Sequence, residues 1–350
     1  MPYDIEKTSF GGVDLNDPFF DSLKQDYSGF EEWFRDKADQ PAYVLRDDEG
    51  IQAFLYLKIE DEAVEDVDPP LPSGRHLKIG TFKINAHGTR LGERFIKRAF
   101  DYALAEDADD IYVTVFPKHE PLIDLFQKYG FEKVGTKTTE NGTEDVYLRS
   151  LDSTVEDVVQ DYPLIHHRGR DKFILSIYPE WHTQLLPDSI LNNETIDLLD
   201  DVSHTNSIHK AYICRMEGVE ELQRGDILVI YRTKDDQGPA YYRSVATSIC
   251  VVEEYRSRSD FENVGHFVDY CEKYSIFDAD DLRKWWRYWS PLHVIRFTYN
   301  VPLQRRLNRK RLLEEVGLPK EAYWGFFKIS DDAFHRIIEL GDVDESYLID

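Results

Sequence analysis

The chain has 350 residues, 41% of them hydrophobic and 13% aromatic, which predicts globular structure with room for two domains and excludes a disordered protein. Its net charge of −25 excludes diffuse attraction to nucleic acid, although a local basic patch could still bind it. The scattered cysteines Cys214, Cys250 and Cys271 form no CxxC pair, which is typical of a cytoplasmic protein. No signal-peptide core and no run near the roughly 18 apolar residues of a membrane span is present, so we expect no membrane association.

The first 150 residues predict a mixture of strands and helices. Strand-like runs occupy residues 42–46, 51–59, 76–85 and 111–116. Two short helices are expected within 16–40, where Asp17 or Asn16 can cap the first helix and Ser28 the second. An amphipathic helix follows the third strand, and another helix ends at Gly130. Asn141-Gly142 then predicts a closing hairpin.

A glycine-containing loop runs directly from the third strand into the amphipathic helix. Its sequence is His87-Gly88-Thr89-Arg90-Leu91-Gly92. Successive backbone N–H groups of such a loop can turn toward one point at the helix N-terminus, where the helix dipole also favours an anion. Glycines permit a close approach because they lack a Cβ atom. The loop therefore predicts a phosphate-binding site.

The element order and two motifs resemble the GNAT acetyltransferases over about residues 1–150. Residues 87–92 stand at the GNAT phosphate loop, and HEPLIDLFQKYGF, ending in Gly130-Phe131, stands at a second family motif. The resemblance implies a mixed sheet with flanking helices and acetyl-CoA as co-substrate. It implies that the loop holds the pyrophosphate and that the pantetheine arm lies along Phe82 to Ile84, hydrogen-bonded like an extra strand.

The chain departs from the family pattern at several positions. Arg90 replaces a loop glycine and either strengthens phosphate binding or blocks the close approach; we expect binding to be retained. Phe126 stands where the family often has a tyrosine that protonates the departing thiolate. Tyr129, three residues later, could replace that acid, or solvent could, or Tyr129 is a packed aromatic. His119 stands in place of an asparagine and is either a catalyst or a loop residue.

No general base stands out in this acidic sequence. Glu60 and Glu62, at the end of the second strand, are candidates by position only. No Ser/His/Asp arrangement rises above chance, and the histidines lack metal-ligand spacing with cysteines, so no metal site is predicted.

The second half of the chain predicts a further domain at 171–350 after a connector at 151–170. Strand-like runs are at 173–178, 208–216, 225–233, 241–256, 293–303 and 323–330. Helical patterns are at 259–275, 279–288, 303–315 and 331–340. YPEWHTQLL after the first strand, with GDILVIYR and YYRSVATSICVVEEY, resembles the PUA-like superfamily near ASCH and EVE domains. This resemblance implies a small β-barrel with helices that can hold a base of RNA or DNA, and the whole chain is expected to be α+β.

Two stretches of this domain suit nucleic acid binding. RKWWRYW at 283–289 offers Trp285 and Tyr288 for stacking, and RRLNRKR at 305–311 offers Arg305, Arg309 and Lys310 for phosphates. Alternatively, the tryptophans are core residues and the arginines pair with the abundant carboxylates.

Together these patterns predict an acetyl-CoA-dependent N-acyltransferase whose second domain recognises the acceptor, RNA or an RNA-linked amine. One alternative is a non-catalytic nucleic-acid reader whose first half only senses acyl-CoA. Another is acetylation of a protein or small amine, with the second domain serving assembly.

Overall fold

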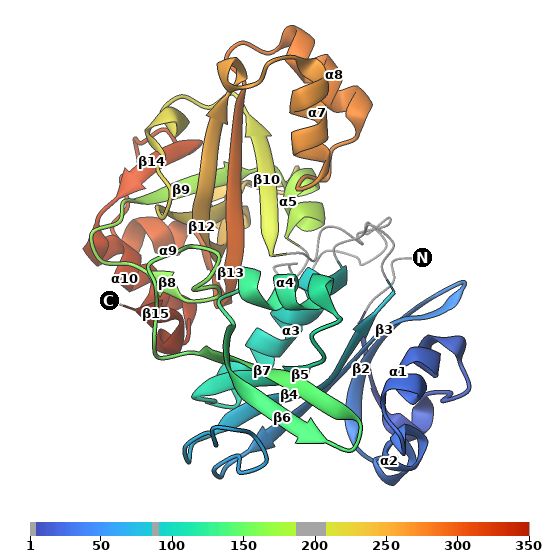
Figure 1. Ribbon diagram of the computed structural model, residues 1–350. Helices are drawn as coiled ribbons and strands as arrows, with labels where there is room; N and C mark the ends of the chain where they lie inside the picture. The colour runs from blue at the N-terminus through green and yellow to red at the C-terminus, as the bar shows by residue number, and fades with distance from the viewer. Residues whose placement is uncertain (1–4, 86–90, 187–207, 350) are drawn as a thin grey trace. The chain divides into compact units, whose positions relative to one another are not determined.

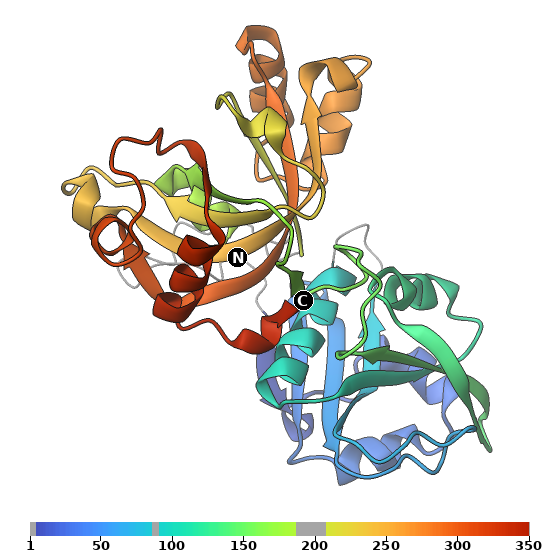
Figure 2. The ribbon, with the colours of Figure 1, turned by 90° about the vertical axis from the view of Figure 1, so that its left-hand side faces the viewer.

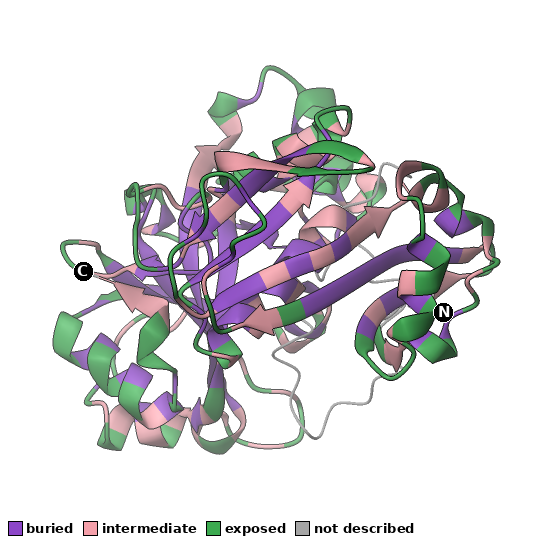
Figure 3. Ribbon diagram, turned by 60° about the horizontal axis from the view of Figure 1, so that its bottom comes forward, coloured by how far each residue is buried: buried purple, intermediate pink, exposed green. Residues whose placement is uncertain are grey.

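The chain folds into two compact units, Met1–Val155 and Glu156–Asp350. The computed structural model describes residues 5–85, 91–186 and 208–349 (Figure 1). Both units combine sheets with helices, so the predicted α+β class is confirmed. Buried residues concentrate in the sheets, whereas the helices carry exposed residues on their outer sides (Figure 3).

The first unit is built on a seven-stranded mixed sheet of order β1-β2-β3-β4-β5-β7-β6. Its strands are β1 Glu6–Ser9, β2 Pro41–Asp47, β3 Gly50–Glu60, β4 His76–Ile84, β5 Asp110–Val115, β6 Glu132–Thr139 and β7 Gly142–Ser150. The β4–β5 pair is parallel and the other pairs are antiparallel. A parallel pair needs a crossover, which the chain makes through α3.

Helices cover both faces of this sheet. They are α1 Asp21–Asp26, α2 Phe30–Asp36, α3 Leu91–Ala105 and α4 Glu120–Lys128, with 3-10 turns η1 Phe10–Gly12 and η2 Pro18–Phe20. One face packs Phe54 and Tyr56 of β3 against Phe20 and Phe34 beside α1 and α2. On the other face, Phe82 of β4 contacts rings of α3 and α4.

The second unit contains a six-stranded sheet of order β10-β13-β12-β11-β9-β14. Its strands are β9 Lys172–Ile177, β10 His209–Cys214, β11 Ile227–Arg232, β12 Val245–Ser257, β13 His293–Asn308 and β14 Phe326–Ile329. A separate pair joins β8 Ile165–His166 to β15 Leu348–Ile349. Bulges interrupt the long β12–β13 ladder at three places. Within the described residues no pairing joins the outer strands β10 and β14, so the expected barrel is an open sheet here.

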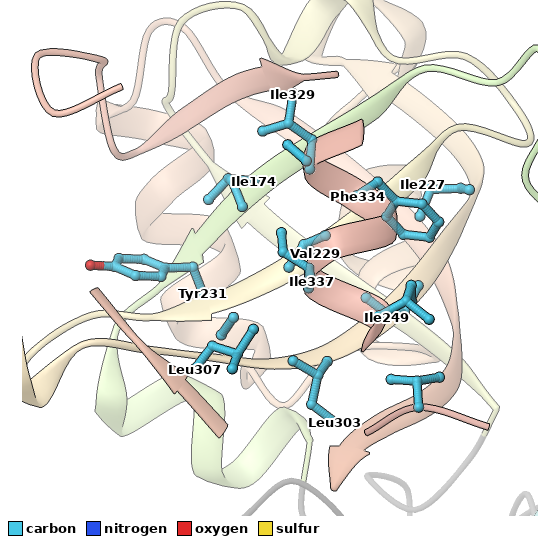
Figure 4. Packing of buried hydrophobic residues seen from close by; sticks show 14 of the residues in the cluster. Ile174, Ile227, Val229, Tyr231, Ile249, Leu303, Leu307, Ile329, Phe334 and Ile337 are labelled. Atoms are coloured by element: carbon cyan, nitrogen blue, oxygen red, sulfur yellow. The ribbon is translucent and has the colours of Figure 1, made fainter. Parts of the chain in front are cut away.

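Two cores lie on opposite faces of that sheet, because successive strand residues point to opposite sides. The unit's helices are α5 Pro179–Leu185, α6 Ala240–Arg243, α7 Val264–Glu272, α8 Ala279–Tyr288, α9 Arg309–Glu314 and α10 Asp331–Gly341, with 3-10 turns η5 Val219–Glu221, η6 Arg258–Asp260 and η7 Glu345–Tyr347. Phe334 and Ile337 of α10 pack on Ile174 and Val229 (Figure 4). Helices α7 and α8 lie at one end of β12 and β13 (Figures 1 and 2).

Two organisational predictions need correction. The expected connector 151–170 is largely folded into the second unit: Tyr162 and Ile165 are fully buried, and the Tyr162 hydroxyl donates to the Tyr299 carbonyl at 3.0 Å. The helix expected at 303–315 is wrong in its first half, because β13 continues to Asn308. Leu303 and Leu307 are buried and four residues apart, which suits one face of a helix, but residues four apart also lie on the same side of a strand.

Candidate functional site

The first candidate site is the point where β4 and β5 stop pairing. Their parallel ladder runs from His76↔Asp110 only to Ile79↔Val113, although β4 continues to Ile84. On its other side β4 stays paired with β3 as far as Ala53↔Ile84. The last residues of β4 therefore present a strand edge toward β5 that no described strand covers.

Gly80 marks the start of this opening. The β3–β4 register shifts beside it, because Tyr56 pairs with Thr81 whereas Leu57 pairs with Ile79. A Cβ atom on Gly80 would lie 2.6 Å from the Tyr56 ring, which real Cβ atoms do not tolerate. A glycine is thus required at this bulge, and a bulge bends the strand that carries it.

The predicted cofactor residues gather on the α3–α4 side of this opening. The Phe82 ring centroid lies 5.4 Å from that of Phe126, whose side chain is fully buried. Leu91 is the first residue of α3 and is buried. A Cβ atom on Gly92 would lie 2.7 Å from a methyl of Leu125, so this glycine also permits close packing of α3 on α4. His87, Gly88, Thr89 and Arg90 lie outside the described residues.

Tyr129 follows α4 and is fully buried, with the Lys128 ammonium 5.1 Å from its ring centroid. Burial agrees with the packed-aromatic alternative, and the acid role stays a prediction. His119 lies at the N-terminal end of α4 with its side chain 43% exposed. Its Nε2 is 3.2 Å from a carboxylate oxygen of Asp26, which also pairs with Lys118. Because β5 ends at Val115, His119 lies four residues beyond the C-terminal end of this strand.

Glu60, a candidate base by position, lies toward the opposite end of β4 from Phe82, and its role as a base stays a prediction. It pairs in register with His76, whereas Phe82 is six residues farther along β4, about 20 Å at the usual strand rise. The Tyr112 hydroxyl donates to Glu60, and Lys58 and Lys78 lie beside it. Burial alone would raise the pKa of Glu60, but these hydrogen bonds and charges lower it. The Glu60 carboxylate thus belongs to a polar cluster with Tyr112, Lys58 and Lys78.

A contact between the α1–α2 loop and the β6–β7 hairpin was not predicted from the amino-acid sequence. The Tyr27 hydroxyl donates to Glu144 Oε1 at 2.6 Å, and burial together with this carboxylate raises the pKa of Tyr27. Ser28, expected to cap α2, instead donates its N–H and its hydroxyl to Asn141 Oδ1, each at 2.8 Å. These partners are more than 110 residues apart, so no local pattern could have revealed them.

Of the residues predicted to contact nucleic-acid phosphates, Arg305 and Lys310 are exposed, whereas Arg309 packs on an aromatic ring. The Arg305 side chain is 70% exposed and lies 3.4 Å from Asp342, and Lys310 lies 3.8 Å from Glu314. The Arg309 guanidinium lies over the Trp324 ring at 4.4 Å. These residues follow the end of β13 into the start of α9.

The aromatic candidates on α8 have opposite environments. Tyr288 is 67% exposed. Trp285 is buried and packs on Phe277 and Trp289, with centroid distances of 4.6 and 4.5 Å. The stacking role predicted for Trp285 is therefore corrected, because its ring belongs to the core between α8 and the sheet.

A buried polar cluster lies between α5 and the sheet of the second unit. His182 is fully buried, and its Nε2 is 2.8 Å from the Thr247 hydroxyl. Arg306 donates to the Thr247 carbonyl at 2.6 Å. Burial and the charges of Arg232 and Arg306 lower the pKa of His182 to about 3, so its imidazole is neutral.

No described group of three or more His, Cys, Asp or Glu side chains could hold a metal ion. Among the helices described, none has the length and apolar character needed to cross a membrane.

Comparison with known proteins gives matches to solved structures only. No protein-family model and no curated protein matches the chain. The similar structures include both kinds of protein that the sequence resembles. An ASCH protein from Zymomonas mobilis is 10% identical, with 48% of this chain and 94% of that chain covered and a TM-score of 0.34. NAA60 from Arabidopsis thaliana, in complex with a bisubstrate analogue, is 18% identical, with 41% and 95% covered and a TM-score of 0.30. An IAA acetyltransferase from Bacillus cereus is 12% identical, with 41% and 97% covered and a TM-score of 0.31.

Proposed function

We propose that the first unit is an N-acyltransferase that binds acetyl-CoA at the opening between β4 and β5. The observation that carries this proposal is the β4 edge beyond Ile79, which is free of β5 although β4 remains anchored to β3. Backbone amides on such an edge can pair with the amide groups of a pantetheine arm as another strand would. An N–H group near Phe82 would also polarise the thioester carbonyl.

The surrounding residues would have separate tasks in this proposal. Phe82 and Phe126 form an apolar wall beside the β4 edge. The N-terminus of α3 at Leu91 and Gly92 favours the pyrophosphate, together with the loop 87–90. An uncharged amine would attack the thioester carbonyl carbon directly. Tyr129 or water would protonate the departing thiolate.

Calorimetric titration of the full chain with acetyl-CoA tests the proposal. A valine at Gly88 blocks the approach of an anion to the loop, so Gly88→Val should weaken acetyl-CoA binding at least tenfold, about 1.4 kcal/mol. Gly238→Val is a matched control, because Gly238 lies in a turn of the second unit with only the Arg243 side chain nearby. Equal affinity of the folded Gly88 variant and the control would refute the phosphate-loop assignment. Absence of binding to the wild type would refute the function.

For the second unit we propose recognition of the acceptor through RNA. The supporting observation is the run of cationic side chains from Arg305 to Lys310, of which Arg305 is largely exposed, in a protein of net charge −25. Tyr288 supplies an exposed ring that could stack on a base. The rival function, a reader without catalysis, would bind acetyl-CoA and RNA but transfer no acetyl group.

A further inference from the structure

Glu144 is a buried carboxylate without a cationic partner. It lies on β7 and is 4% exposed. Within the described residues its side chain accepts a hydrogen bond from Tyr27 and forms no ion pair. Lys137 is its register partner on β6, but the Lys137 ammonium pairs with Asp66 at 2.5 Å. Burying an unpaired carboxylate is costly, so a site that keeps one calls for an explanation.

The position of Glu144 relates it to the proposed thioester site. Its neighbour Asp145 pairs with Val115 of β5, two residues beyond the last β4–β5 pair at Val113. Because β5 lies between β7 and β4, Glu144 is two strand spacings, about 10 Å, from the β4 edge of the opening. Tyr27, which holds its carboxylate, also contacts the ring of Phe116 just after β5, with centroids 5.3 Å apart.

The side of the sheet also fits an acceptor. Along β7, Glu144 and Val146 point to the same face, because they are two residues apart. Val146 packs with Tyr112 and the loop residue Val64, away from α3 and α4. Phe82 points to the opposite face, which α3 and α4 cover. Glu144 and Tyr27 thus lie on the face of the sheet opposite to Phe82.

We propose that Glu144, held in place by Tyr27, binds the ammonium group of a small primary amine and removes its proton. This inference depends on the proposed acetyl transfer. One proton passes from the ammonium nitrogen to the Glu144 carboxylate, which frees the nitrogen lone pair. The C–N bond then forms, the nitrogen loses its second proton, and the C–S bond breaks with its electron pair on sulfur. Sulfur takes up a proton, so the products are an amide, a thiol and one proton released to water.

Two features favour a small amine. The bonds of Ser28 to Asn141 hold the α1–α2 loop against the β6–β7 turn beside Glu144. Asp26, the other carboxylate near Tyr27, is already paired with Lys118 and His119. Among the described residues near Tyr27, Glu144 is thus a carboxylate without an ion pair, and it suits a cationic acceptor.

Glu144→Gln in the full chain tests the inference, because glutamine keeps the shape and can accept from Tyr27 but cannot take the proton. The probes are ethanolamine, cadaverine and triglycine, with thiol release and amide formation both measured. We expect kcat/KM to fall by roughly 100-fold or more with unchanged acetyl-CoA affinity. Glu144→Asp should restore part of the rate.

Glu140→Gln is the matched control, because Glu140 lies exposed on the neighbouring turn. If Glu144→Gln fails to fold, Tyr27→Phe replaces it and should lower kcat/KM about tenfold. Wild-type rates in the folded variants would overturn the inference, as would acetyl-CoA binding by a wild type that acetylates none of the three amines. Absence of acetyl-CoA binding would instead overturn the proposed function itself.

Discussion

His76 is a buried residue whose two ring nitrogens both face acceptors. Nδ1 lies 2.8 and 3.0 Å from the two oxygens of Asp110, and Nε2 lies 2.9 Å from the Pro72 carbonyl. Burial alone would lower the pKa of His76, but these hydrogen bonds raise it. Burial also raises the pKa of the Asp110 carboxyl, although its bond to His76 opposes that rise. His76 and Asp110 are register partners, so the pair fastens the first residues of β4 to β5.

His76 should make the stability of the first unit depend on pH. Because its pKa is raised by folding, its contribution is complete below the unfolded value of about 6.5 and is lost as pH rises through the folded value. His76→Gln should lower stability by about 1–3 kcal/mol at pH 6 and flatten this dependence. Amide hydrogen exchange of β4 and β5 peptides from pH 5.5 to 8.5, corrected for intrinsic rates, would measure it. An unchanged pH slope in the variant would contradict the assignment.

At the scale of the element, β4 has two different edges. It pairs with β3 along its whole length but with β5 over its first four residues only. The change falls at Gly80, where the Tyr56 ring occupies the space of a side chain. Tyr56 cannot easily move, because it packs edge-on against Phe10 with centroids 5.0 Å apart. The opening is thus a consequence of how β4 packs on the aromatic core.

Gly80→Val should therefore damage both the sheet and the proposed cofactor site. Overpacking against Tyr56 should cost about 1–3 kcal/mol of stability. Acetyl-CoA affinity should fall as well, because the displaced β4 edge would no longer hold its backbone amides in position to pair with the pantetheine arm. Thermal unfolding and calorimetric titration measure the two effects. The double variant Gly80→Val/Tyr56→Ala removes the clash and should recover part of the affinity; a variant with wild-type affinity would show that the bulge does not shape the site.

Over the whole molecule, negatively charged residues outnumber positively charged ones. The chain carries 67 acidic and 42 basic residues. Any binding of nucleic acid must therefore come from a local basic surface, because diffuse attraction is absent. Arg305 and Lys310 are the exposed cations of the candidate surface, whereas Arg309 rests on Trp324 and so also contributes to packing.

Charge reversal tests this surface without disturbing the core. Arg305→Glu/Lys310→Glu should abolish binding to a random single-stranded RNA pool at low salt, measured by fluorescence anisotropy. The salt dependence of any residual binding should be shallower than that of the wild type, because fewer counterions are released. Acetyl-CoA affinity should not change. Lys320→Glu, an exposed lysine outside this run, is the control. RNA binding that survives the double reversal would exclude these residues.

Features that depend on neighbouring residues could be predicted from the amino-acid sequence. Asp17 caps the turn after it as predicted, accepting from the Phe19 N–H at 2.8 Å, and Asn141-Gly142 lies at the β6–β7 hairpin. The order of strands and helices, and hence the α+β class, also followed from local periodicity and turn chemistry.

Contacts between residues that are distant along the chain became clear from the folded structure alone. The 303–308 segment is a strand because Leu307 and Asn308 pair with β12, and spacing alone cannot distinguish this from a helix. Register along β4 placed Glu60 far from Phe82. The Tyr27–Glu144 contact joins residues 117 apart, and Trp285 is buried by elements that precede and follow it. Such contacts depend on burial and pairing across the chain, which no local pattern encodes.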